Sequence, residues 1–135
     1  MLKANFITAQ EAAEKIQDGS TLCTIGMTLV SASESILKAI EKRFETVGHP
    51  ADITLVHSCG QSDRKDGIQH LAHEGLVKRI IGSHWGLQPR WMEMIANSQV
   101  EAYCLPQGQI AQLYRSMACG LPGKMSKVGL GTFID

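Results

Sequence analysis

Residues 76–115 read LVKRIIGSHWGLQPRWMEMIANSQVEAYCLPQGQIAQLYR and contain two strand-then-helix units in succession. The short apolar runs at 76–82 and 100–105 are typical of buried strands. Pro89 suits the first position of a helix, and the apolar residues after Gly108 recur at intervals of three and four. This alternation predicts an α/β fold with an open, mostly parallel sheet, covered by helices and joined by right-handed crossovers.

The same alternation extends toward the amino terminus. Two further strands are predicted, at 20–25 and 52–58. Three helices accompany them, indicated by a capping box at Thr8 and Glu11, a second box at Ser31 and Glu34 with a stop at Gly48, and the stretch 68–75.

The last apolar run, KVGLGTFI at 127–134, resembles a fifth strand and is followed at once by Asp135. A strand that is buried on both faces needs a covering layer. We therefore expect residues 1–135 to be the amino-terminal part of a larger domain that this chain leaves incomplete.

The composition is that of a globular protein with no electrostatic preference for nucleic acid. Of the 135 residues, 44% are hydrophobic, and 13 basic residues balance 13 acidic ones. A basic excess that would favour phosphate backbones or anionic membranes is lacking. The sequence has neither an apolar run of about 18 residues nor a signal peptide, so a cytoplasmic location is expected, with no nucleic acid and no membrane as partner. The four cysteines are expected to be free and mostly buried.

Candidate site residues follow the predicted strands, because ligands of such sheets bind beyond the carboxyl ends of the strands. These segments are rich in glycine and amides and poor in carboxylates, which suits a polar ligand held by amide donors. They are Gly26–Met27, 58–67, 83–88 and 106–108. Gln107 is singled out: it is either an amide donor to a ligand carbonyl at the start of a helix or a plain turn residue.

Motifs for several other chemistries are missing from the sequence. It contains no G-x-G-x-x-G, no phosphate-binding loop with Gly-Lys-Ser/Thr and no G-x-S-x-G nucleophile motif. His70 and His73 are three residues apart, but no third ligand is evident, so a surface or capping role is favoured and no metal is expected. His57 is expected to be a half-buried structural histidine.

The two tryptophans are expected to have different roles. Trp91 lies on the apolar side of a predicted helix and is expected in the core. Trp85 follows a predicted strand, where it serves either as a wall for a ligand or as structural packing. The candidate substrate-binding residues at the strand ends are Gly26, Met27, His84, Trp85 and Gly108.

Three segments resemble the amino-terminal, alpha-subunit-like half of family I coenzyme A (CoA) transferases, closest to the acetate, propionate and acetoacetate type. They are AHEGLVKRIIGSHWGLQPR at 72–90, EAYCLPQGQIAQLYR at 101–115 and VGLGTFID at 128–135. The likeness begins at ITAQEAAEKIQDGSTLCTIG, residues 7–26, so it covers essentially the whole chain.

The resemblance implies a CoA-transferase-like fold and a ping-pong reaction that moves CoA between an acyl-CoA and a short carboxylic acid. The CoA thioester is then a substrate, and no cofactor is bound permanently. In the family a glutamate attacks the thioester, forms an acyl-glutamyl anhydride and then carries CoA as a glutamyl thioester. The glutamine of the family's P-Q-G motif corresponds to Gln107, whose amide would stabilise the oxyanion.

The resemblance also implies what must come from outside this chain. The nucleophilic glutamate and most of the CoA-binding surface belong to the later, beta-like half, and no glutamate here matches the motif around it. The isolated chain is therefore expected to be inactive without a carboxyl-terminal half or beta-like subunit, and the complete protein to be a homo-oligomer. Gly26-Met27 and residues 32–34 also depart from the family's Gly-Phe and Pro-Glu pattern.

Two alternative functions remain at the level of sequence. One is a phosphosugar isomerase on a related sheet, which would need a catalytic carboxylate or lysine near the strand ends. The other is a non-catalytic assembly fragment whose exposed sheet edge and apolar faces pair with another chain.

Overall fold

The computed structural model describes residues 4–135 and has the predicted α/β architecture. Its four parallel strands lie in the order β1-β2-β3-β4, so each strand is hydrogen-bonded to the next one along the chain. The strands are β1 (Thr21–Thr24), β2 (Ile53–His57), β3 (Val77–Gly82) and β4 (Glu101–Cys104). The helices are α1 (Ala9–Glu14), α2 (Glu34–Val47), the 3₁₀ helix η1 (Gly67–Leu71), α3 (Pro89–Ala96) and α4 (Gln107–Ala118).

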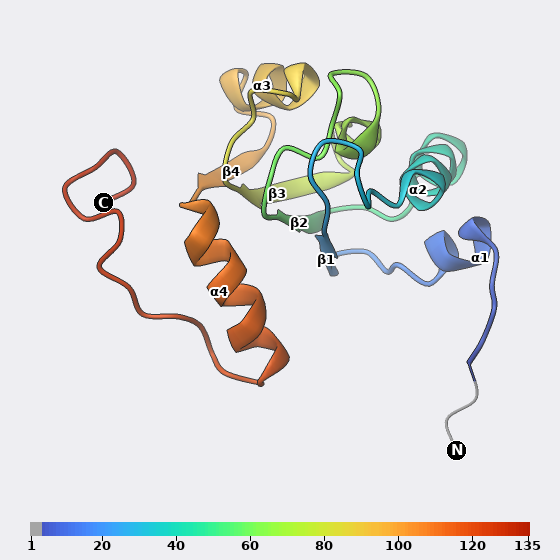
Figure 1. Cartoon of the computed structure of the whole chain (residues 1–135). Helices are drawn as coiled ribbons and strands as arrows, with labels where there is room; N and C mark the ends of the chain where they lie inside the picture. Colours follow the sequence, from blue (N-terminus) through green and yellow to red (C-terminus); the bar gives the residue numbers. More distant parts are fainter. Residues whose placement is uncertain (1–3) are drawn as a thin grey trace.

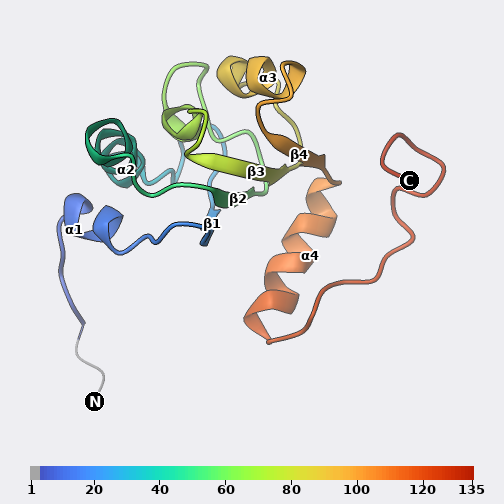
Figure 2. The same ribbon diagram turned by 180° about the vertical axis from the view of Figure 1, so that it is seen from behind.

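The helices are divided unequally between the two faces of the sheet. Figure 1 shows α2, η1 and α3 on one face and α4 on the other, and the view from behind agrees (Figure 2). The main core lies under the first group and includes Ile40, Leu55, Ile80 and Trp91, all fully buried. Each such side chain contributes roughly 1.5–3 kcal/mol to folding. The second face is less covered, and Tyr103 of β4 is 46% exposed there.

The first helix begins as predicted. The Thr8 hydroxyl accepts a hydrogen bond from the Glu11 amide at 3.2 Å, and the Glu11 carboxylate accepts one from the Thr8 amide at 2.7 Å. Arg43 of α2 then donates to the carbonyl oxygens of Ala13 and Ile16, at 2.7 and 2.9 Å. These bonds tie α2 to the end of α1, where the last carbonyls of a helix have no amide of a following turn to accept from in the regular pattern. Within residues 4–135, none of the helices combines the length and apolarity that crossing a bilayer requires.

The predicted capping box at Ser31 and Glu34 is wrong. Ser31 lies in a turn with φ of +63°, and the residue before α2 is Ser33, whose side chain makes no capping bond. Glu34 instead accepts a hydrogen bond from the Gly67 amide at 2.9 Å, a contact across 33 residues. The predicted stop at Gly48 is confirmed by its left-handed conformation, with φ of +74°.

Two other local predictions need correction. The stretch 68–75 forms only the short 3₁₀ helix η1, and the chain then turns through Glu74 to Leu76. The run 127–134 is not a fifth strand, because its amides are used in local turns such as that from Leu130 to the Lys127 carbonyl at 3.3 Å. Among residues 4–135 no strand lies beside this run, so its backbone has no ladder to join.

The cysteines are free, as predicted, but they are not mostly buried. Cys23 and Cys119 are exposed, and Cys59 and Cys104 are intermediate. Cys23 is exposed because β1 is an edge strand on which partly buried and exposed residues alternate. A period of two on an edge strand places every second side chain on the less covered face.

Candidate functional site

Hydrogen bonds connect the loops that follow the first three strands. The Thr28 amide, after β1, donates to the Gly60 carbonyl at 2.9 Å. The Gly60 amide, after β2, donates to Nε2 of His84 at 3.2 Å. Because Nε2 accepts this bond, His84 carries its proton on Nδ1. Gly26, Met27 and His84 are therefore brought to the same edge of the sheet, as their positions after the strands predict.

Gly26 and Met27 begin a tight turn after β1. Gly26 has φ of +140°, and the amides and carbonyls of Met27 and Val30 are paired at 3.1 and 2.9 Å. The Met27 side chain is 60% exposed, so it is available to a ligand or to further polypeptide at this edge.

Two buried glutamines, whose roles no sequence pattern indicates, support these loops. Gln61 donates from Nε2 to the Thr24 carbonyl at 2.9 Å. The side-chain amide of Gln88 is oriented so that both of its ends are satisfied. Its nitrogen donates to the His84 backbone carbonyl at 3.0 Å, and its oxygen accepts from the Gln61 backbone N–H at 3.1 Å. Both residues lie in segments noted above as following strands, but sequence spacing could not distinguish a buried amide from an exposed one.

His57 is fully buried at the end of β2 rather than half-buried. Its Nδ1–H donates to the Cys59 carbonyl at 2.7 Å, and its ring meets Trp85 edge-on with centroids 5.1 Å apart. A Cβ at Gly82 would lie 2.3 Å from His57 Nε2, so the close approach of β3 requires glycine. Burial lowers the pKa of His57 to about 4, with a small further lowering from His84, while the bond to Cys59 opposes the shift.

Acidification is therefore expected to destabilise the chain through His57. The pKa of its ring falls from 6.5 to about 4 on folding. Between these values the unfolded chain binds the proton and the folded chain does not, so the free energy of unfolding falls as the pH is lowered. The slope approaches about 1.36 kcal/mol per pH unit once the unfolded imidazole is mostly protonated, so the loss from pH ~6.5 to pH ~5 is roughly 1.5–2 kcal/mol. Urea unfolding at the two pH values measures it.

His57→Leu removes the titrating group and should reduce this pH dependence by roughly 1.5–2 kcal/mol. His49→Gln is the matched control, because the His49 side chain is 55% exposed. That variant should keep the full pH dependence. The same pH dependence in His57→Leu and in the unmodified chain would contradict the assignment.

The two tryptophans are placed differently. Trp91 is fully buried, as predicted, and its Nε1 donates to the Ile68 carbonyl at 2.9 Å. Trp85 is partly buried and packs against the main core as well as against His57. Its structural packing is thus established, and a role as ligand wall stays a prediction.

Gln107 and Gly108 form the exposed first turn of α4, immediately after β4. Within residues 4–135, the Gln107 side chain makes no hydrogen bond, so its amide is available at the positive end of a 12-residue helix. A cavity of about 310 Å³ beside this turn is lined in part by Ser83, Leu105 and Pro106. A second cavity of about 270 Å³ shares Leu105 and Pro106. The turn that carries Gln107 therefore borders hollow surface at the carboxyl ends of β3 and β4.

His70 and His73 are not simple surface or capping residues. Both lie against α2, with His70 12% and His73 20% exposed, and both contact the Glu41 carboxylate. Burial alone would lower the pKa of His70, but hydrogen bonds to Glu41 and Glu34 outweigh it and raise that pKa. Glu34 and Glu41 are seven residues apart on one helix, so their shared face was readable from sequence, whereas their histidine partners were not.

The family profile described as Coenzyme A transferase matches residues 6–135. The chain is 39% identical over 98% of its length to a caffeate CoA-transferase of Acetobacterium woodii. It is 36% identical over 96% of its length to the acetate CoA-transferase YdiF of Escherichia coli K12. A crystal structure of the acyl-CoA transferase YdiF from E. coli O157:H7, in a thioester complex with CoA, superposes with a TM-score of 0.88 at 34% identity and covers 96% of this chain.

The chain matches only part of the length of each relative. The chain spans 25% of the length of the two curated relatives and 27% of the crystallised chain. The rest of their length has no counterpart in the 135 residues of this sequence.

Proposed function

Because the chain belongs to the coenzyme A transferase family, we propose that it provides one part of an active site that moves CoA between an acyl-CoA and a free carboxylic acid. The observation that carries the proposal is the family match from residue 6 to residue 135. The exposed position of Gln107, directly after Pro106, which lines both cavities at the strand ends, supports it. The proposed substrates are an acyl-CoA and a short carboxylic acid; one relative is named for acetate, a short acid, and another for caffeate, a larger aromatic acid.

In this proposal, Gln107 stabilises the oxygen of the reacting thioester. When a carboxylate attacks the carbonyl carbon, the C=O electron pair moves to the oxygen, which becomes an oxyanion. The Gln107 side-chain N–H donates to that oxygen, and the amides at the start of α4 add positive potential. The thiolate of CoA then leaves as the carbonyl reforms. Gln107 takes no proton and forms no covalent bond, so a glutamine is chemically sufficient.

The attacking carboxylate is proposed to come from polypeptide outside this chain. Glu34 and Glu41 are among the better buried glutamates. Both belong to α2 and not to a loop after a strand, and both are already paired with His70. Gly26, Met27, His84, Trp85 and Gly108 remain candidates for substrate contacts. The complete site then needs a carboxyl-terminal half or a second subunit, and this accords with the quarter of the relatives' length that the chain spans.

A chimera tests the proposal directly. Residues 6–135 would replace the matching segment of E. coli YdiF, and exchange of CoA from acetyl-CoA to propionate would be followed by mass spectrometry. We expect exchange by the chimera and none by the isolated chain. Caffeate as acceptor tests whether the acid must be short.

Two results would argue against this assignment. Robust exchange by the isolated chain would place the nucleophile within residues 1–135. A chimera that folds, by circular dichroism and gel filtration, but does not exchange CoA with any of the acids would show that these residues cannot form the proposed part of the site.

A further inference from the structure

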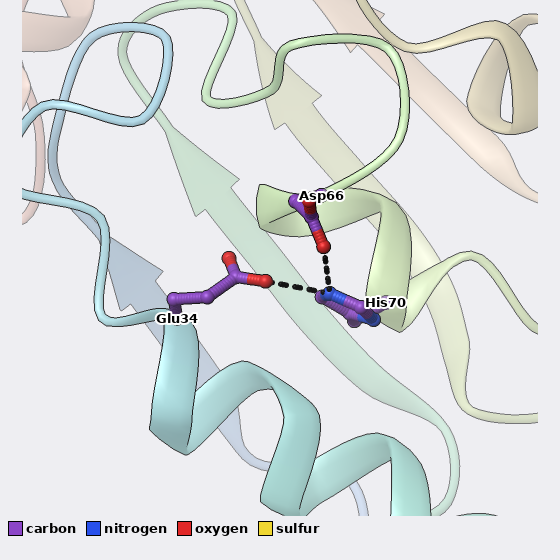
Figure 3. Close-up of side chains that lie close together, drawn as sticks. All are labelled: Glu34, Asp66 and His70. Carbon is purple, nitrogen blue, oxygen red and sulfur yellow. Dashed lines mark hydrogen bonds and ion pairs between the residues drawn. The ribbon is translucent and has the colours of Figure 1, made fainter.

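A cluster of ionisable side chains lies between α2 and η1, with His70 at its centre (Figure 3). His70 Nε2 lies 2.8 Å from Glu34 Oε1 and 3.3 Å from Asp66 Oδ1. On the other side of the ring, Nδ1 lies 2.5 Å from Glu41 Oε2. Glu34 and His70 are far apart in the sequence, so only the fold brings these atoms together.

The cluster carries an excess of negative charge. Its carboxylates are those of Glu34, Glu41, Asp66 and, beside His73, Glu45. Its permanent cations are Lys38 and Arg90. The four carboxylates therefore outnumber the two permanent cations by two. Because His70 is only 12% and Glu41 only 18% exposed, water screens this charge less than at an open surface. A divalent cation would compensate it.

Two of the carboxylate oxygens already converge on a cation. Lys38 Nζ lies 3.0 Å from Glu34 Oε1 and 3.3 Å from Asp66 Oδ1, which are the same two atoms that face His70 Nε2. The Lys38 side chain is 54% exposed, and its four-carbon stem is flexible. Its ammonium can move into water when a stronger cation competes for the two oxygens.

The orientation of His70 suits metal ligation. Histidines that bind metals commonly donate their second ring N–H to a carboxylate, which directs the other nitrogen at the ion. Glu41 is placed to accept from Nδ1–H, which leaves Nε2 directed at Glu34 and Asp66. Donors around a tetrahedral zinc ion, each about 2.0–2.2 Å from it, lie roughly 3.3–3.5 Å from one another. The separations of 2.8 and 3.3 Å reach this with a shift of about half an ångström.

We propose that Glu34, Asp66 and His70 form a binding site for Zn²⁺ that cross-links α2 to the loop after β2. When the ion enters, Lys38 leaves the two carboxylate oxygens, His70 releases its Nε2 proton to water, and a water molecule completes the tetrahedron. An imidazole with two carboxylates favours zinc over Mg²⁺ or Ca²⁺, which prefer oxygen ligands alone. The site is structural and does not depend on transferase activity.

Calorimetric titration of the chain with ZnCl₂ tests the proposal, with circular dichroism to establish that each variant is folded. We expect one saturable site and a rise in Tm with zinc. His70→Asn should weaken binding by about 100-fold, given that even supporting partners of a ligand matter by about 10- to 100-fold. Lys38→Met should strengthen it about tenfold, because a competing charge within 4 Å is removed.

Matched controls exclude effects of charge or imidazole loss alone. Lys42→Met makes the same change on α2, at a lysine that has no ion pair in the described part of the chain, and should leave the zinc affinity unchanged. His49→Asn removes an imidazole that pairs with Asp18 and should also have no effect. Co²⁺ in place of Zn²⁺ should give visible bands of tetrahedral nitrogen and oxygen ligation without a thiolate band in the near ultraviolet.

Three results would overturn the proposal. One is the absence of saturable zinc binding by the unmodified chain. Another is binding that persists at full strength in both His70→Asn and Glu34→Gln. The last is a strong Co²⁺–thiolate band, which would assign the bound ion to the cysteines. Should His70→Asn fail to fold, Lys38→Met decides the question, since tighter binding is expected only if the ion displaces that ammonium.

Discussion

Gly67→Ala is expected to lower the free energy of unfolding by about 3–5 kcal/mol, enough to unfold much of the chain. Gly67 has φ of +76°, and an added Cβ would lie 2.0 Å from the Gln61 carbonyl oxygen and 3.1 Å from the Ser62 Cα. Left-handed backbone costs a residue with a side chain roughly 1–3 kcal/mol, and overpacking costs a similar amount. The clashing atoms belong to buried backbone, so no flexible side chain can move aside.

The Gln61 carbonyl adds to the expected loss, because it accepts a hydrogen bond from the Ile68 amide at 2.9 Å. A shift that relieves the clash would break that bond and displace the buried Gln61, whose amide holds the end of β1. The damage should therefore reach the loops at the strand ends. Urea unfolding followed by circular dichroism measures the change in stability.

Gly48→Ala and Gly108→Ala separate the cost of the left-handed backbone from the cost of the close contact with Gln61. Gly48 has nearly the same φ, +74°, but an added Cβ would meet nothing within 4 Å, so its loss should be about 1 kcal/mol. Gly108 has open space and lies in the first turn of α4, so alanine there should be neutral or stabilising by up to about 1 kcal/mol. A loss in Gly67→Ala no larger than in Gly48→Ala would show that the close contact costs nothing.

Gln107→Ala is expected to lower kcat of the active chimera by about 10²–10³-fold, or roughly 2.7–4 kcal/mol. The amide is proposed to bind the thioester oxygen most strongly when that oxygen carries negative charge, so the loss should appear mainly in kcat and less in KM. Stability should change little, since the side chain is exposed and unpartnered within residues 4–135. Steady-state exchange between acetyl-CoA and propionate provides both constants.

Gln107→Glu and Gln112→Ala define the origin of that loss. Glutamate keeps the size of the side chain but replaces the N–H donor with a negative charge, so Gln107→Glu should be at least as impaired as Gln107→Ala. Gln112 is an exposed glutamine on the same helix, and its alanine variant should keep kcat within about twofold. Activity of Gln107→Ala within threefold of the unmodified chimera, or full activity of Gln107→Glu, would refute the role of an amide donor.

Much of the fold could be predicted because its determinants are local. The strands at 20–25, 52–58, 76–82 and 100–105 were each placed to within one residue at either end, as apolar runs between turn residues. Likewise, the Thr8 box depends on atoms three residues apart. The box predicted at Ser31 and Glu34 is wrong because the sequence spacing is present but the capping conformation is not. The Glu34 carboxylate instead accepts a hydrogen bond from the Gly67 amide, a partner that no local pattern reveals.

The candidate site was predictable in position but not in structure. A parallel sheet places every loop after a strand at the same edge, so the positions of Gly26, His84 and Gln107 after their strands predict that they lie at that edge. The bonds from Gly60 to His84 and from Gln61 to Thr24 span 24 and 37 residues, and no spacing rule relates such pairs. Whether each named side chain touches substrate remains a prediction.

The sequence by itself determined the alternation of strands and helices, the helix ends at Thr8 and Gly48, and the membership of a family whose pattern it carries throughout. These depend on neighbours along the chain and on the residue types themselves. Only the tertiary structure decided that His57 is buried and neutral, that His70 meets the carboxylates of α2, and that 127–134 is not a strand. Burial, pKa and strand pairing are set by groups distant in sequence, whose positions exist only once the sheet and its helices have packed.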